Sequence, residues 1–139
     1  MRYMMLIYSR EADRDSLPDE ERRKDMEGHL AVMDETAKRG ILVAVSPLAR
    51  TSAATTVRVH QGKVLTTDGP YAETKEQLAG YYVLDCENLD EAIAWAARIP
   101  TCCHGMEGCV EIRPLQEFPA VPDSFRKSKA AFASVLKDE

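Results

Sequence analysis

The chain has 139 residues, of which 45% are hydrophobic and 29% charged, and its formal net charge is −5. This length and composition are typical of one globular domain. The negative charge, without a basic patch interleaved with aromatic residues, argues against nucleic acid as a partner. The first apolar run, Tyr3 to Tyr8, is too short for a signal peptide or a membrane span, so we expect a cytoplasmic protein with no membrane contact.

The first third of the chain predicts a strand, a helix and a strand. Residues 2–9 are almost continuously apolar, which is typical of a central strand. Ser16 begins a sequence with the spacing of a capping box, and Gly40 is placed to end the helix. The predicted buried face of this helix is made of apolar residues spaced by four, three and four: Met26, Leu30, Met33 and Ala37. A second strand is expected at residues 41–46.

The middle of the chain predicts an inserted hairpin and a stiff turn. Residues 51–67 alternate in polarity around Gln61-Gly62, which can form the hairpin turn. Asp68-Gly69-Pro70 is a turn sequence, because Gly accepts a positive φ and Pro fixes its own φ. A third strand of the main sheet is expected at residues 80–86.

The last elements are a helix from Asn88 to about Ile99 and a strand at residues 108–115. Asn88 and Glu91 have the spacing of a capping box. The predicted buried stripe of the helix is Leu89, Ile93, Ala96 and Ala97. A stiff linker at residues 119–122 then precedes a short amphipathic helix, expected to pack on its own dimer or, alternatively, to dock on another protein.

Without the hairpin, the order of elements is βαββαβ. This order predicts an α+β, ferredoxin-like domain over residues 1–118, with two helices on one face of an antiparallel sheet. Residues 119–139 form the C-terminal extension. The second face of the sheet also carries apolar residues, and a second copy of the domain is the economical way to cover it. We therefore expect a homodimer.

Three sequence segments point to a family. The run DGPYAETKEQLAGYYVLD at residues 68–85, with the later LDEAIAWAARIP and VEIRPL, closely resembles the DGPF branch of the YCII-related family. The resemblance covers roughly residues 2–115. It implies a ferredoxin-like domain that pairs into a dimeric α/β barrel, similar to muconolactone isomerase. It also implies an acid–base site containing a histidine and an aspartate.

His29 and Asp68 are the predicted catalytic pair. The sequence around His29 resembles the family's first helix, whose histidine is the suggested acid–base group, and imidazole titrates near neutral pH. The family's aspartate is expected after the second helix, where this chain has Arg98-Ile99-Pro100, so Asp68 is taken as its substitute. A carboxylate beside the imidazole would raise the pKa of His29. The alternatives are a helix histidine without a role and an aspartate that only forms a turn.

Four further residues are candidates for binding a small polar or aromatic ligand: Glu73, Lys75, Tyr81 and Arg113. Tyr81 and Tyr82 should point to opposite faces of their strand, so that one hydroxyl can reach a pocket while the other ring packs in the core. Arg113 shares a strand face with Glu111 and could bind an anion. The alternatives are a solvated loop for the charged run and an interface ion pair of Arg113 with Glu73 or Glu76.

Three cysteines and a histidine lie close together in the sequence: Cys102, Cys103, His104 and Cys109. Thiolates and imidazoles are zinc ligands, but adjacent cysteines rarely both reach one ion, and this spacing matches no standard zinc motif. We expect reduced thiols and no native metal site.

Two functions from different classes remain open. The first is an enzyme without a cofactor that catalyses proton transfer, isomerisation or elimination on a small molecule. The sequence has no phosphate-binding glycine loop, nucleophile elbow or HExxH motif, which argues against nucleotide cofactors and hydrolytic triads. The second is a non-catalytic accessory or ligand-sensing module associated with an extracytoplasmic-function sigma factor, because DGPF-type proteins resemble accessory proteins encoded beside such factors.

Overall fold

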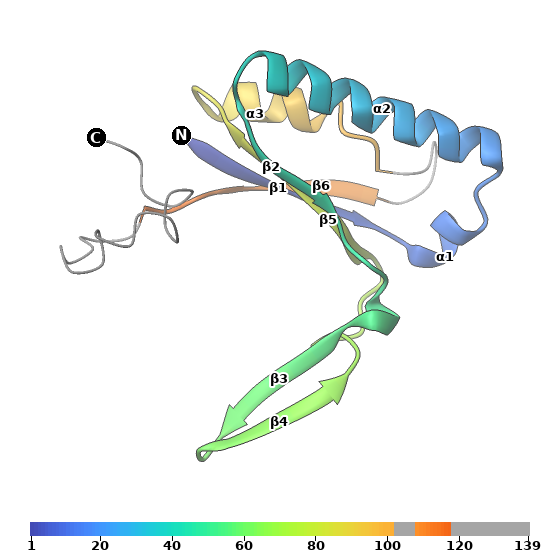
Figure 1. Cartoon of the computed structure of the whole chain (residues 1–139), viewed down its shortest axis with the longest axis vertical. Helices are drawn as coiled ribbons and strands as arrows, with labels where there is room; N and C mark the ends of the chain where they lie inside the picture. Colours follow the sequence, from blue (N-terminus) through green and yellow to red (C-terminus); the bar gives the residue numbers. More distant parts are fainter. Residues whose placement is uncertain (102–107, 118–139) are drawn as a thin grey trace.

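The structure, a computed structural model, describes residues 1–101 and 108–117 and contains a four-stranded antiparallel sheet. Its strands run in the order β2 (Leu42–Pro47), β5 (Gln77–Asp85), β1 (Arg2–Ser9) and β6 (Gly108–Pro114). Helices α2 (Asp19–Lys38) and α3 (Leu89–Ala96) lie on the same face of this sheet (Figure 1). The predicted α+β, ferredoxin-like fold is confirmed.

The core lies between the helices and one face of the sheet. Strand β1 alternates strictly, so that Tyr3, Met5, Ile7 and Ser9 are buried while the residues between them are partly exposed. On β5, Tyr82 and Leu84 are buried beside them. Each large apolar side chain fully buried here contributes about 1.5–3 kcal/mol of stability. The packing of β1 against β5 therefore fixes the positions of the side chains on β5.

Helix α2 begins later than the sequence predicts. Its N-cap is Pro18, without a side-chain cap, and Ser16 instead follows a short helix, α1 (Glu11–Asp15). The Ser16 hydroxyl donates a hydrogen bond to the Asp13 carbonyl oxygen at 3.0 Å. The predicted capping box at Ser16 is wrong, because a residue that precedes a proline is disfavoured in the helical conformation.

The buried faces of both helices are rotated from those predicted. In α2 the buried residues are Val32 and Thr36, whereas Met26 and Leu30 are exposed by 59% and 52%. Thr36 tolerates burial because its hydroxyl donates to the Val32 carbonyl oxygen at 2.7 Å.

In α3 the buried residues are Ala92 and Trp95, and the predicted stripe residues Leu89 and Ile93 are half exposed. The large indole ring of Trp95 fills the part of the core that Leu89 and Ile93 are predicted to fill.

Several predicted helix ends are confirmed. Gly40 follows the C-cap Arg39 of α2 with a φ of 71°. Asn88 caps α3, since its side-chain oxygen accepts a hydrogen bond from the Glu91 amide at 2.9 Å. The Glu91 carboxylate in turn accepts from the Glu87 amide at 2.6 Å.

The predicted hairpin is present as a separate two-stranded sheet. After the 3₁₀ turn η1 (Thr51–Ala53), strands β3 (Thr55–His60) and β4 (Lys63–Asp68) pair around Gln61 and Gly62, both with positive φ. This hairpin projects away from the main sheet, on the side opposite α2 and α3 (Figure 1). It does not fold back over the helices.

Two predictions concern other parts of the chain. The linker and helix expected at residues 119–139 lie outside the described residues. Within the described ranges we find no helix with the length and apolar character that a membrane span requires.

Candidate acid–base site

A cavity of about 270 Å³ lies on the helix-covered side of the sheet, between α2 and the adjoining ends of β2 and β5. Most of its wall is apolar and comes from α2, β2 and the segment after α3: Met26, Leu30, Met33, Val45, Pro47 and Pro100. The exposure of Met26 and Leu30 is thereby explained, because both form part of a cavity wall instead of the core. The polar groups in this wall include Arg14, Asp25, His29 and Tyr82.

His29 is held against the sheet by Tyr82. The Nδ1 atom of His29 lies 2.8 Å from the Tyr82 hydroxyl oxygen, and the two rings stack with centroids 6.0 Å apart. A phenol both donates and accepts hydrogen bonds, so this contact serves either tautomer of His29. Because Nδ1 is occupied, Nε2 is the nitrogen left for chemistry.

Asp25 lies one helical turn before His29 on α2. Its Oδ2 atom is 3.8 Å from His29 Nε2, which is too long for a hydrogen bond but within ion-pair distance. Its Oδ1 atom is buried and has no hydrogen-bond partner among the described residues. A buried carboxylate oxygen without a hydrogen-bond partner costs free energy, which is unusual outside functional sites.

Burial governs the acid–base properties of this pair. Burial lowers the pKa of His29 below its ordinary value; Asp25 opposes this effect and Arg14 adds to it. Burial, assisted by Asp25, raises the pKa of Tyr82 to about 12. At neutral pH the site therefore combines a neutral imidazole with a protonated phenol. The expected rise in the pKa of His29 from a neighbouring carboxylate is present but is outweighed by burial.

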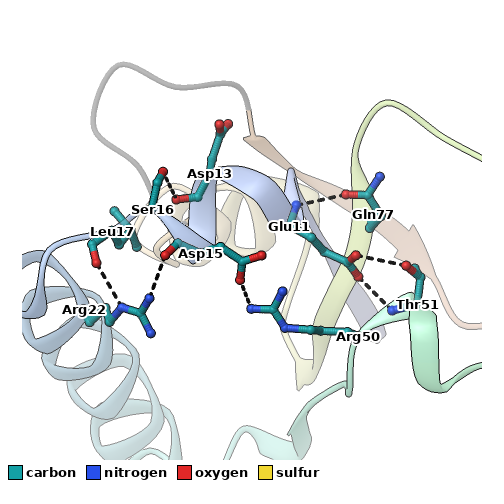
Figure 2. A network of polar contacts seen from close by, with 9 residues as sticks. All are labelled: Glu11, Asp13, Asp15, Ser16, Leu17, Arg22, Arg50, Thr51 and Gln77. Atoms are coloured by element: carbon teal, nitrogen blue, oxygen red, sulfur yellow. Dashed lines mark hydrogen bonds and ion pairs between the residues drawn. The ribbon is translucent and has the colours of Figure 1, made fainter.

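The short helix α1, which carries Arg14, is fixed by a polar network (Figure 2). The Glu11 carboxylate accepts hydrogen bonds from the amide and the hydroxyl of Thr51, at 2.8 and 2.9 Å. The Glu11 amide donates to the Gln77 side-chain oxygen at 3.0 Å. Helix α1 is thus tied both to η1 and to the start of β5.

Arg22 of α2 holds the other end of α1. Its guanidinium donates to the carbonyl oxygens of Leu17 and Asp15, each at 3.0 Å (Figure 2). The Asp15 carboxylate in turn forms an ion pair with Arg50. This network holds the backbone on either side of Arg14 in place.

Two close backbone approaches shape the cavity wall. A Cβ atom on Gly28 would lie 2.7 Å from Cγ of Pro100, so α2 and the segment after α3 meet beside His29. A Cβ atom on Gly80 would lie 2.8 Å from the Ser46 carbonyl oxygen, where β2 and β5 meet. Glycine at both positions allows these parts of the wall to approach closely.

The structure brings only part of the predicted site together. His29 lines the cavity, and so does Tyr81, but it is the Tyr82 hydroxyl that contacts His29. Asp68 lies exposed at the end of β4 and does not line the cavity, so His29 and Asp68 do not meet within one chain. The carboxylate beside His29 is that of Asp25.

The remaining ligand-binding candidates also lie away from the cavity. Glu73 and Lys75 are exposed in the segment between β4 and β5. Arg113 is exposed on β6, and its Nε donates to Glu111 at 3.1 Å, so within one chain its carboxylate partner is Glu111.

Of the predicted thiol cluster, Cys102, Cys103 and His104 lie outside the described residues. Cys109 is exposed on β6, with its Sγ atom 3.8 Å from a carboxylate oxygen of Glu76. Burial of the thiol, together with Glu76, raises the pKa of Cys109. In the part of the chain that the structure describes, no three His, Cys, Asp or Glu side chains are grouped to hold a metal ion.

Three residues of the site were not predicted. Asp25 could have been found, because residues four apart on a helix are neighbours. Tyr82 follows from the alternation of β5 once the helix-covered face is known. Arg14 gave no signal, since α1 itself was not predicted.

Comparison with known proteins places this geometry in a family. The family model of the YCII-related domain matches residues 1–119. An uncharacterized protein of Rhizobium meliloti (strain 1021) is 38% identical over 115 residues, which cover 83% of this chain and 92% of that relative. The family match includes the four-stranded sheet, the three α-helices of the described residues and every residue of the cavity wall.

Proposed function

The chain belongs to the YCII-related domain family, and we propose that it is a cofactor-independent enzyme that transfers a proton on a small molecule, with His29 as the general base. One observation carries this proposal: a neutral imidazole is held by Tyr82 beside a carboxylate in the wall of a cavity. Supporting side chains on both sides of a histidine are what a positioned proton-transfer group requires.

The reaction takes place at Nε2 of His29. In the reactive tautomer Nδ1 carries the proton and donates it in the hydrogen bond to Tyr82, which leaves a lone pair on Nε2. A C–H group beside a carbonyl of the substrate gives its proton to Nε2, and the electron pair stays on the substrate. Return of the proton to another carbon completes an isomerisation. In an elimination the electron pair instead forms a new C=C bond, and a leaving group on the neighbouring carbon departs with its own bonding pair.

Asp25 stabilises the charged intermediate of this cycle. When Nε2 accepts a proton, the imidazolium lies 3.8 Å from the Asp25 carboxylate. Opposite charges at this distance attract strongly in a partly buried site. Asp25 thereby favours the protonated form of His29, while burial outweighs this effect and keeps the resting histidine neutral.

Deuterium exchange tests the proposal without knowledge of the product. The protein is incubated in D₂O with a panel of small carbonyl compounds, and deuterium incorporation at carbon is measured by mass spectrometry. We expect protein-dependent exchange that is lost in His29→Asn and retained in His60→Asn, since His60 is exposed on the hairpin. Exchange that survives His29→Asn would overturn the assignment of the base.

A homodimer is the assembly that we propose. Within the described residues, both α2 and α3 lie on one face of the sheet, and the hairpin carries the exposed side chains Val57, Val59 and Val64. An isolated two-stranded hairpin is marginally stable in water, so burial of this apolar surface on a second copy would stabilise it.

The alternative proposal, a ligand-sensing accessory module, uses the same cavity without turnover. Ligand binding with no deuterium exchange on any compound of the panel would favour it. Co-purification with an extracytoplasmic-function sigma factor would identify the partner class.

A further inference from the structure

The strongest unassigned feature is the cationic side chain at the cavity, that of Arg14. It lines the cavity, is partly buried, and lies close enough to His29 to influence its titration. Among the described residues, no carboxylate forms an ion pair with Arg14. Three other arginines of the same region, Arg10, Arg22 and Arg50, have carboxylate or carbonyl partners.

From this arrangement we propose that the cavity binds a small organic carboxylate, with Arg14 as the anchor for the anion and His29 at the reacting carbon. The proposal rests on the proposed function and names its substrate class. A guanidinium presents two parallel N–H donors that match a carboxylate, which makes arginine the preferred anchor for such ligands.

The rest of the cavity fits the body of such a ligand. Its volume of about 270 Å³ suits a molecule smaller than a typical drug, since drug-sized sites span roughly 300–1,000 Å³. Apolar side chains of Met26, Leu30, Met33 and Val45 surround the space between the polar groups. An aliphatic or aromatic acid places its apolar part against these side chains and its charge on Arg14.

The polar groups also explain why the ligand should carry only one anionic group. Asp25 lies beside His29 and has a buried oxygen without a partner among the described residues. A second anionic group at this end of the ligand would be repelled by Asp25. A hydroxyl or enol at the reacting end can instead donate a hydrogen bond to Asp25.

Arg14 is suited to anchor the carboxylate because the segment that carries it is fixed beside the cavity. The hydrogen bonds of Glu11 and Arg22 fix the segment on either side of it (Figure 2). The backbone that carries Arg14 is therefore ordered before the ligand arrives, which reduces the entropy lost on binding. No other arginine lines the cavity among the described residues.

Matched pairs of acids and amides test the inference by calorimetry. Phenylacetate and hexanoate are compared with phenylacetamide and hexanamide on the wild type, Arg14→Gln, Arg14→Lys and Arg10→Gln. Loss of a charge-assisted pair should weaken acid binding to Arg14→Gln by about tenfold to a hundredfold, with a smaller loss in Arg14→Lys. Amide binding should be unchanged, and Arg10→Gln, which alters the residue just before α1 but not the cavity wall, should behave as the wild type.

The outcomes separate this inference from the proposed function. Acids that bind through Arg14 without His29-dependent exchange would support the anchor and contradict the enzyme. Equal binding of acids and amides, equal binding by Arg14→Gln and the wild type, or no binding of either acid would overturn the anchor. His29-dependent exchange on keto acids that is indifferent to Arg14→Gln would overturn the anchor and leave the enzyme standing.

Discussion

The Tyr82 hydroxyl oxygen lies 2.8 Å from Nδ1 of His29, across the packed interface between β5 and α2. This contact joins the buried centre of the sheet to the only histidine of the cavity wall within the described residues. Because Tyr82 is 1% exposed, its ring cannot move without disturbing the core. The orientation of the imidazole is therefore set by the fold itself.

Removal of that hydroxyl should impair proton transfer without unfolding the protein. In Tyr82→Phe, Nδ1 of His29 loses its partner, and we expect the deuterium exchange rate to fall by about tenfold and the stability by about 1 kcal/mol. Tyr3→Phe is the control, because Tyr3 is also buried on β1 but does not line the cavity. An unchanged exchange rate in Tyr82→Phe would show that this hydrogen bond does not position the base.

The lowered pKa of His29 should appear in the pH dependence of stability. Between the lowered folded-state pKa and the ordinary value of 6.5, the unfolded chain binds more protons at His29 than the folded protein. The free energy of unfolding should therefore rise with pH through this window and fall as the solution is acidified.

The measurement is urea unfolding of the wild type and His29→Asn at several pH values. The difference, wild type minus variant, should increase up to about pH 6.5 and then level off. A difference that is flat or decreases over this range would contradict a neutral, buried His29.

Gly80 should not tolerate a side chain. The Cβ atom of Gly80→Ala would lie 2.8 Å from the Ser46 carbonyl oxygen and 3.2 Å from the Pro47 Cα atom, both of them backbone atoms that cannot rotate away. We expect a loss of about 1–3 kcal/mol, because overpacking forces β2 and β5 apart. An unchanged midpoint of chemical denaturation in Gly80→Ala would show that β2 and β5 can separate at this point without loss of stability.

The order of strands and helices could be predicted from the sequence pattern, whereas the buried faces of the two long helices could not. Strands and caps are local signals, and they were read correctly for β1 and for Asn88 of α3. The buried face of a helix depends instead on which side chains the sheet can accept. In α2 that choice left Met26 and Leu30 for the cavity, a distinction that apolar periodicity alone does not contain.

Only part of the candidate site could be predicted from the sequence, for a similar reason. His29 stood out by its chemistry, and Asp25 was within reach of a simple spacing argument. Asp68 is the predicted substitute for the aspartate that the family has after its second helix, yet β4, which ends at Asp68, belongs to the hairpin on the side opposite the helices (Figure 1). The direction in which the hairpin projects decides whether Asp68 can meet His29, and local sequence does not specify that direction.

The hairpin offers a test of the proposed dimer. Val59 and Val64 are cross-strand partners, exposed by 69% and 67%. The double variant Val59→Thr with Val64→Thr keeps β propensity but removes apolar surface, and it should weaken dimerisation by about tenfold or more.

Sedimentation velocity over a concentration series measures this effect. Ile93→Thr on α3 is the control, since Ile93 is half exposed on a helix, on the side of the sheet opposite the hairpin (Figure 1). A monomeric wild type at micromolar concentration would contradict the dimer. A double variant that associates as the wild type does would exclude the hairpin from the interface.

Titration of the His29 imidazole by NMR tests directly whether His29 is a neutral base at neutral pH. With the imidazole isotopically labelled, we expect a pKa below 6.5 that falls further in Asp25→Asn, because Asp25 is the group that raises it. A pKa at or above 6.5 that does not respond to Asp25→Asn would contradict a neutral, buried base, since His29 would then behave as a solvent-exposed helix residue.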